Sequence, residues 1–415
     1  MTIALRPLEG RSRGYYLLLA GLAAAVLAGL GAAWTMEHQG HIVTGMTNQV
    51  VWGLPHVFAV FLIVAASGAL NVASIASVFG QAVYKPLAPL SGLLAIALLI
   101  GGLCVLMLDL GRPDRLIVAM THYNFKSIFA WNVILYSGFT GLVIVYLWTM
   151  MERRMNRFTP LAGMAAFVWR IALTTGTGSI FGFLVARQAY NSALLAPMFI
   201  VLSLSYGSAV FLLVLITGMH WGGRPLGPAL LARLARLQVV FIAATLYFML
   251  VYHLTNLYFT KQHDFERFIL LDGGVHSMLF WLGQVLVGML LPLALLLHPA
   301  TRATVRAVAV AAALVILGAL AQMYVTIIGG QAFPLVLFPG RQVSSSFHDG
   351  MVGAYNPSLP EWLLGLGGMA VAGLIVLLAL RLLRFLPERL DDRALEAGPA
   401  APGAAAVAGP AAAGN

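Results

Sequence analysis

The chain has 415 residues, of which 60% are hydrophobic and only 9% are charged, and its formal net charge is +10. Soluble domains have roughly 45–50% apolar and about 25% charged residues, so this composition excludes a soluble globular protein. It indicates an integral membrane protein, which contacts lipid over much of its surface.

Ten apolar stretches could cross a membrane as helices, which takes roughly 20 residues each. They lack the short alternating period of barrel strands, so we expect an all-α integral membrane protein with ten transmembrane helices. The predicted spans are residues 15–34, 51–79, 87–108, 127–150, 160–184, 194–219, 229–258, 268–297, 303–328 and 360–385.

Two segments lie outside the predicted spans at the ends of the chain. Residues 1–14 form a short N-terminal segment that contains arginines, and residues 386–415 form a C-terminal tail. From about residue 396 this tail is a low-complexity run of Ala, Gly and Pro. Such a run cannot bury a hydrophobic core, so we expect it to be disordered.

Lys and Arg are distributed unevenly between the two sides of the predicted spans. Sixteen lie on the side that holds both termini, seven lie on the other side, and Arg170 lies within a span. Because the cytoplasmic side of a membrane protein carries the excess of Lys and Arg, both termini are predicted to be cytoplasmic. The positive net charge is therefore a signal of topology and does not indicate a nucleic-acid partner.

The third and fourth predicted spans are joined by a highly charged link on the outer side, MLDLGRPDRLIVAMTHYNFKSIFAW (107–131). Polar and titratable side chains are costly in lipid, so they usually face the interior of a helix bundle and have partners. The candidates that fall in the outer third of the membrane near this link are His56, Asp109, His122 and Trp131. The sequence therefore predicts a polar pocket at the outer surface.

Asp109 has two interpretations. In the first, Arg112 holds its carboxylate charged and oriented beside a ligand, and Trp52 or Trp131 stacks on that ligand. In the second, the motif GRPD only ends a helix at Gly111, and Asp109 and Arg112 form a solvated pair worth about 0–1 kcal/mol. The residues alone leave both interpretations open.

The sequence contains a single cysteine, Cys104, and none of the patterns CxxC, CxxCH, HExxH or a P-loop. One thiol cannot form a disulfide within the chain, and an iron–sulfur cluster takes about four cysteines. If this protein moves electrons, the redox metals are therefore expected in partner subunits, with no iron–sulfur cluster in this chain.

Five residues within the predicted spans are candidates for proton transfer, namely Asn132, Tyr136, Arg170, His253 and His276. Arg170 lies about ten residues, or roughly 15 Å, into the fifth span, which is too deep for its side chain to reach the surface easily. A buried imidazole titrates near neutrality, so the two histidines could also exchange protons. Structural ion pairs and contacts between helices explain these residues equally well, and no continuous chain of carboxylates crosses spans two to five.

Two stretches resemble one family of membrane proteins. LDLGRPDR, followed by THYNFKSIFAWNVILYSGF, is similar to a link and the following span in the NrfD/polysulfide reductase membrane subunits. Residues 337–368 resemble the last outer link and span of the ten-span branch of that family. This branch includes DsrP of the DsrMKJOP complex, which the sequence resembles most, and the membrane subunit of type-2 hydrogenases. The resemblance covers nearly the whole chain and implies two four-helix bundles, at about 51–184 and 194–328, with two flanking helices.

The resemblance also implies a haem-free subunit that binds a quinone, either menaquinone or ubiquinone, near the outer face. Such a subunit would exchange electrons with a periplasmic, ferredoxin-like iron–sulfur subunit, in a complex with other subunits such as a multihaem cytochrome c. By this resemblance Asp109 and Arg112 lie at the rim of the quinone pocket, and Arg170 lies on an inward polar track. The candidate quinone-binding residues are thus His56, Asp109, Arg112, His122 and Trp131. The expected location is the cytoplasmic (inner) membrane of a bacterium.

The predicted function is a quinone-binding subunit of a respiratory or sulfur-metabolism redox complex, and two other classes stay open. A secondary transporter would also have many spans and polar residues within them, although its site would lie near the membrane midplane. A haem b cytochrome needs facing axial histidines at matched depths, and His56, His253 and His276 could supply at most one such pair. The sequence does not determine the quinone type, the direction of electron flow or whether protons cross the membrane.

Overall fold

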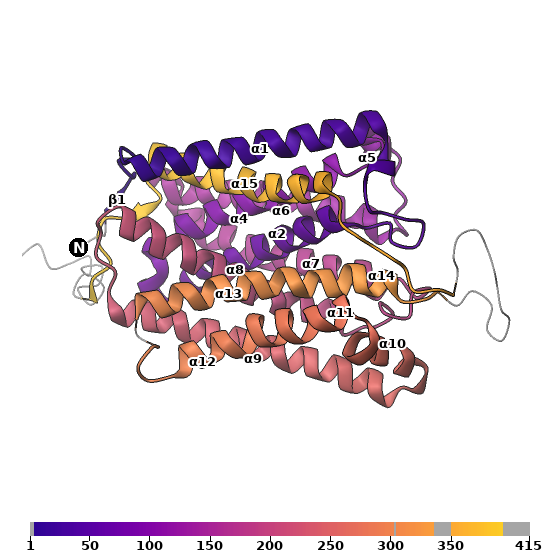
Figure 1. The fold of residues 1–415 in the computed structure, drawn as a ribbon. Helices are drawn as coiled ribbons and strands as arrows, with labels where there is room; N and C mark the ends of the chain where they lie inside the picture. The colour runs from indigo at the N-terminus through magenta and orange to yellow at the C-terminus, as the bar shows by residue number, and fades with distance from the viewer. Residues whose placement is uncertain (1–3, 303, 336–349, 393–415) are drawn as a thin grey trace, which may run out of the picture.

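The computed structural model describes residues 4–302, 304–335 and 350–392 of the chain. This part of the protein is mostly helical, and the long helices lie side by side in one elongated bundle (Figure 1). The prediction of an all-α fold is confirmed. The tail from residue 396 and the middle of the predicted outer link, 329–359, lie outside the described residues.

The long helices are α1 (Arg13–Gln39), α2 (Leu54–Ala69), α4 (Ala88–Leu108), α6 (Ile128–Met151), α7 (Thr159–Gly182), α8 (Leu195–Trp221), α9 (Pro228–Tyr258), α13 (Val305–Tyr324) and α15 (Leu359–Leu382). The short α-helices are α3 (Asn71–Ser77), α5 (Leu116–Thr121), α10 (His263–Arg267), α11 (Val275–Met278), α12 (Leu291–Leu297) and α14 (Gly330–Ala332). Within the described residues, three segments are π-helical, namely η6 (Phe268–Asp272), η7 (Leu279–Leu290) and η8 (Val325–Gly329). Short 3₁₀ segments are η1 (His41–Val43), η2 (Ala82–Leu87), η3 (Pro113–Arg115), η4 (Arg153–Phe158) and η5 (Thr260–Gln262).

Nine helices in the described part of the chain are long and apolar enough to cross a membrane. Some of them combine neighbouring segments, such as α2 with α3 (Leu54–Ser77) and α11 through α12 (Val275–Leu297). The predicted span 160–184 is also a helix, α7, of 24 residues, but it is not among those nine. The structure therefore confirms a multi-pass membrane protein.

The helices form two groups that contact each other. We call α2, α4, α6 and α7 the first bundle, and α8, α9, η7 with α12, and α13 the second bundle, because each set packs together. The two bundles meet where α8 packs against α2 and α7. Helices α1 and α15 pair with each other, and α15 also packs on α4 and α2, so both lie beside the first bundle (Figure 1).

The contact between the bundles depends on two glycines. A Cβ atom at Gly68 of α2 would overlap the backbone carbonyl of Ser203 in α8, and one at Gly207 of α8 would overlap the backbone of Gly68 and Ala69. Small residues at such crossings let two helix backbones approach closely, which is how many membrane helices associate. The sequence thus sets a tight crossing between the two bundles.

Both ends of the described chain lie at the same end of the bundle (Figure 1). Strand β1 (Leu5–Arg6) pairs antiparallel with β2 (Leu386–Pro387), and Arg224 donates hydrogen bonds to the backbone oxygens of Arg6 and Leu386. We call this the terminal end and the opposite one the far end. The first residues of the predicted tail are therefore packed, and Leu386 and Leu390 are fully buried.

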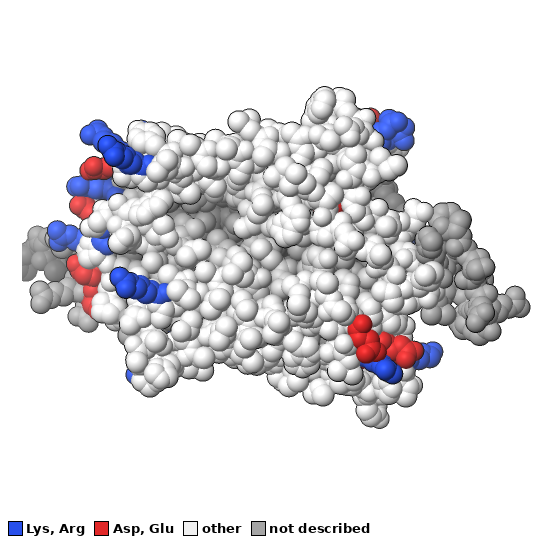
Figure 2. All heavy atoms as spheres, viewed as in Figure 1, with Lys and Arg blue, Asp and Glu red and all other residues white. Residues whose placement is uncertain are grey.

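Charged side chains gather at the two ends of the molecule, and the face between them is almost entirely uncharged (Figure 2). An uncharged belt between two charged ends is the surface that a hydrocarbon layer about 30 Å thick requires. The far end carries the segments that connect α1 to α2, α4 to α6 and α7 to α8, and these connections build the candidate site.

Candidate functional site

The first bundle brings two predicted residues together at its far end. His56 lies in the first turn of α2, and Asp109 follows the last residue of α4, its packing neighbour. The imidazole Nδ1 of His56 is 2.7 Å from Oδ2 of Asp109, and the side chains are only 17% and 1% exposed. A buried carboxylate requires a partner of this kind, so the pair is a specific arrangement of two titratable groups.

A cleft of about 910 Å³ opens beside this pair. Its lining comes from the segment before α2, the end of α4 and the segment before α15: His41, Ile42, Met46, Thr47, Asn48, Gln49, Val51, Asp109, Gly111, Met351, Val352 and Ala354. Oδ1 of Asp109 and Nδ1 of His41 are buried and have no hydrogen-bond partner among the described groups. Buried polar atoms are nearly always paired, so these two are positions where a bound molecule would form hydrogen bonds.

Trp52 is the tryptophan that packs against the pair. Its ring is stacked with that of His56, with centroids 6.0 Å apart and planes 21° apart, and it also contacts Phe181 and Tyr190. Trp131 is 45% exposed, and its Nε1 donates to the carbonyl oxygen of Phe125. Of the two tryptophans considered from the sequence, Trp52 therefore lies against His56.

Like Trp131, the predicted pocket residues Arg112 and His122 lie apart from the His56–Asp109 pair. The expectation that Arg112 binds Asp109 is wrong: the carboxylate pairs with His56, and the Arg112 side chain is exposed and makes none of the ion pairs found among the described residues. Helix α4 ends at Leu108, and the chain then turns so that Gly111 lies beside His41 while Arg112 faces outward. His122 is also exposed, with Thr121 as its hydrogen-bond partner.

A buried glutamate, which was not predicted from the sequence, joins the walls of the cleft by hydrogen bonds. Glu361 in the first turn of α15 is 0% exposed, and its Oε2 accepts hydrogen bonds from the backbone N–H groups of Gly45 and Ser358, both at 2.8 Å. Its Oε1 accepts a 2.6 Å hydrogen bond from the Tyr355 hydroxyl, which itself accepts the N–H of Leu54 at 2.6 Å. Glu361 thus connects both walls to the start of α2, two residues from His56.

Burial and the adjacent Glu361 carboxylate raise the pKa of Tyr355, so its phenol stays protonated at neutral pH and donates to that carboxylate. A second set of hydrogen bonds joins the same wall to the second bundle. Oε1 of Gln331 accepts the N–H groups of Val51 and Trp52, both at 3.0 Å. Arg187 donates to the carbonyl oxygens of Gln331 and Gln49, both at 2.7 Å. The cleft is therefore held by both bundles and by α15.

The predicted proton-transfer residues of the first bundle lie elsewhere. Arg170 of α7 is 3% exposed, and it donates to the backbone oxygen of Ser67 and to Oδ1 of Asn71, both at 3.1 Å. Asn132 of α6 is buried and donates to the carbonyl oxygen of Gly176 in α7. Tyr136 is buried one turn further along α6. These side chains link helices α2, α6 and α7.

The predicted histidines of the second bundle have different surroundings. Nδ1 of His253 in α9 is 2.7 Å from Oε2 of Glu266 in α10, which is 0% exposed and was not predicted from the sequence. His276 is stacked with Tyr324, and its buried Nδ1 has no partner within the described part of the chain. In that same part, no cluster of three or more His, Cys, Asp or Glu side chains is arranged to hold a metal ion.

The family model described as polysulphide reductase, NrfD, matches residues 42–335. These residues include the whole His56–Asp109 site except His41 and the α15 wall. The chain belongs to the NrfD family. It is 30% identical to the Hdr-like menaquinol oxidoreductase integral membrane subunit of Archaeoglobus fulgidus, over 95% of this NrfD protein and 100% of that relative. It is 23% identical to a selenate reductase subunit of Mesobacillus selenatarsenatis, over 88% of this protein and 91% of that relative. It is also 28% identical to the C subunit of the polysulfide reductase of Wolinella succinogenes, over 60% of this protein and 83% of that relative.

Replacing Tyr355 of this NrfD protein by phenylalanine is expected to lower its stability by about 1–3 kcal/mol, because the buried Leu54 N–H and Glu361 carboxylate lose a partner. The measurement is the thermal unfolding midpoint in detergent. The matched control is Tyr258→Phe, since Tyr258 is 90% exposed, and it should leave the midpoint unchanged. Equal midpoints for both variants would show that Tyr355 does not hold the cleft wall.

Proposed function

We propose that this NrfD protein is the membrane subunit of a multi-subunit redox complex and binds a quinone, menaquinone or ubiquinone, in the far-end cleft. The observation that carries the proposal is a buried His56–Asp109 pair whose free carboxylate oxygen borders an open cleft. The relatives support it, because their names describe a menaquinol oxidoreductase membrane subunit and components of selenate and polysulfide reductases.

The residues at the cleft fit such a ligand. Ligand sites commonly occupy about 300–1,000 Å³ and combine apolar walls with a few polar groups. Here Ile42, Met46 and Val352 supply apolar surface, while Asp109 and His41 supply buried polar atoms without described partners. A quinol has two hydroxyl groups that need such acceptors, and a quinone has two carbonyl groups that need donors.

A bound quinone supplies two-electron chemistry that is coupled to the exchange of two protons. In this chain Asp109 Oδ1 would accept the hydrogen bond of a quinol hydroxyl, and a proton on that carboxyl group could pass between Oδ2 and Nδ1 of His56. His56 stabilises the carboxylate when it is charged, because an imidazolium 2.7 Å away is an opposite charge in a poorly hydrated site. Trp52 covers the imidazole on one side and shields it from water.

The chain offers one cysteine and no motif for haem or cluster attachment, so we propose that electrons pass to or from a periplasmic iron–sulfur subunit that docks at the far end. Other subunits, such as a multihaem cytochrome c, could complete the complex. The excess of Lys and Arg on the terminal side supports cytoplasmic termini in a bacterial inner membrane.

Photoaffinity labelling tests the proposed site. When the purified protein is irradiated with an azidoquinone, mass spectrometry is expected to find labelled peptides that contain residues 41–51 and 351–354. Excess unlabelled quinol should suppress this labelling. Labelling confined to the lipid-facing surface of α1, which no competitor suppresses, would contradict the proposal. A reduced haem band in the absorption spectrum of the isolated chain would favour a cytochrome b, and solute uptake without partners would favour a transporter.

A further inference from the structure

The second bundle contains a His–carboxylate pair with the same geometry as that in the first. Nδ1 of His253 is 2.7 Å from Oε2 of Glu266, and their side chains are 14% and 0% exposed. Asn256, one turn along α9, donates a 2.7 Å hydrogen bond to Oε1 of the same carboxylate. A buried carboxylate requires partners of this kind, and water must reach such a pair if it is to exchange a proton with its surroundings.

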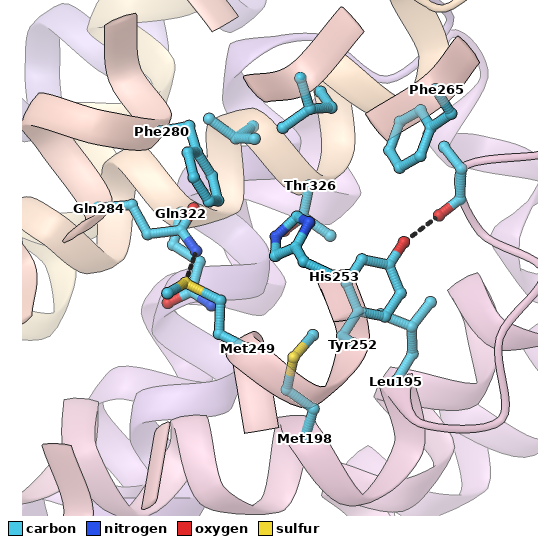
Figure 3. Close-up of a pocket in the computed structure, with 13 residues that line it drawn as sticks. Leu195, Met198, Met249, Tyr252, His253, Phe265, Phe280, Gln284, Gln322 and Thr326 are labelled. Atoms are coloured by element: carbon cyan, nitrogen blue, oxygen red, sulfur yellow. Dashed lines mark hydrogen bonds between the residues drawn. The ribbon is translucent and has the colours of Figure 1, made fainter. Parts of the chain in front are cut away.

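A small cavity reaches this pair from the interior of the second bundle. Figure 3 shows His253 beside Thr326 and Tyr252, with Gln284 and Gln322 on the other side of the space. Its volume is about 40 Å³, which is room for a few water molecules but not for a quinone ring. All three π-helical segments contribute lining residues, Ile269, Phe280, Gln284, Val325 and Thr326. Such segments widen a helix and are frequent at functional sites.

Buried polar side chains continue from this cavity along one face of α9. Gln238, Thr245, Tyr252 and Asn256 are each at most 8% exposed, and the first three are spaced by seven residues. From Gln238 to Asn256 the helix rises about 27 Å, close to the thickness of a hydrocarbon core. The stripe therefore runs from Gln238, about 15 Å along α9 from its start at Pro228, to the His253–Glu266 pair near the far end.

Two atoms of this stripe are buried without a partner among the described groups, Oε1 of Gln238 and Oγ1 of Thr245. A threonine within a helix normally donates to the carbonyl four residues earlier, as Thr174 and Thr177 do here. The Thr245 hydroxyl makes no such hydrogen bond, although the carbonyl four residues earlier is within reach of any threonine in a helix. Orphaned polar groups in a protein interior are usually satisfied by buried water, so the stripe has the character of a hydrated track.

The first bundle also contains buried polar atoms without a described partner, Oδ1 of Asn132 and Nε of Arg170, but it differs in its charge. The α2 residues between His56 and Ser67 are all apolar, and all are buried. Below them lies the Arg170 guanidinium, which has no carboxylate partner among the described ion pairs. A fixed positive charge in a narrow polar region repels protons, as it does in water channels. The predicted proton track through Arg170 is thus electrostatically unfavourable.

We propose that protons cross this protein through the second bundle, along hydrated α9 side chains, with the His253–Glu266 pair as the proton-binding site at the far end. Of the described titratable side chains, Tyr252 of α9 lines the cavity beside His253. Tyr206 of α8 donates to Gln322 of the lining, and His276 lies beside Gly329. One proton enters the track at the terminal end for each proton that leaves it at the far end, or the reverse. The coupling to electron transfer rests on the proposed function.

The test measures quinol-linked turnover and proton movement together in proteoliposomes that contain the full complex and a pH indicator in the lumen. Glu266→Gln keeps the shape and hydrogen-bonding capacity of the side chain, and it is expected to lower the protons moved per electron about tenfold or more. Turnover with an uncoupler should stay unchanged. An unchanged ratio in Glu266→Gln, or a wild-type complex that moves no protons across the membrane, would overturn the proposal.

Thr245→Val separates a proton role from a structural one. It removes a buried hydroxyl without a described partner, so stability should be unchanged or higher, whereas the proton-to-electron ratio should fall. The matched control is Thr174→Val in the first bundle, whose hydroxyl already bonds its own helix and whose ratio should stay at the wild-type value. If the wild-type complex shows no quinol turnover, the proposed function fails. The His253–Glu266 proton-binding site can still be tested by infrared spectra of the protein across a pH titration. A protonated-carboxyl band that persists in Glu266→Gln would then refute that site.

Discussion

Replacing Asp109 by asparagine is expected to lower quinol-linked turnover by about 10²-fold to 10⁴-fold, the range observed when a group that transfers protons is removed. The amide has the shape of the carboxyl group and can still bond Nδ1 of His56, so the fold should persist. It cannot, however, take up the proton of a bound quinol or carry the negative charge that stabilises a protonated imidazole. Turnover of the purified complex, measured with assembly by size-exclusion chromatography, checks this prediction.

The matched control for this variant is Asp114→Asn. Asp114 lies in the same far-end link, within η3, but its side chain makes none of the ion pairs found in the described residues. We expect its turnover to equal that of the wild type. Wild-type turnover in Asp109→Asn would remove the carboxylate from the proposed mechanism, and equal losses in both variants would indicate a general effect of charge on partner docking.

Replacing Gly68 by valine is expected to destabilise the protein by more than about 3 kcal/mol, beyond the usual cost of overpacking a core. The reason is that the first carbon of any side chain at this position would overlap the backbone carbonyl of Ser203, which cannot rotate away. The two bundles would have to separate at this crossing. We expect loss of the monodisperse peak after detergent extraction and a strongly lowered unfolding midpoint.

Gly141→Ala is the control for this effect of size. Gly141 lies within α6, and an added Cβ would meet no heavy atom within 4 Å. Because alanine restricts the unfolded chain more than glycine does, this variant should be neutral or more stable by about 0.4–1 kcal/mol. A well-folded Gly68→Val protein with a normal midpoint would show that the helices do not cross as closely as the structure indicates.

Much of the candidate site could be predicted from the sequence, but its connections could not. His56 and Asp109 stood out because titratable side chains near the ends of apolar spans are costly unless they have partners. Glu361 was not singled out, although Ser358 and Glu361 form a helix-capping motif that can be recognised in a sequence. That motif predicts where a helix begins and contains no information on the distant Tyr355 and Gly45 contacts. Glu266, in the charged segment HDFER, has the local pattern of a solvated link.

The sequence by itself determined the class of protein, the positions of the helices and the bias of Lys and Arg toward one side, because each depends on local composition. Long apolar runs must be helical in lipid whatever surrounds them. Only the tertiary structure decided that Asp109 pairs with His56, 53 residues away, and not with its near neighbour Arg112. Such pairings depend on how α2 packs against α4 and where the chain turns after Leu108, and no local pattern of residues specifies either.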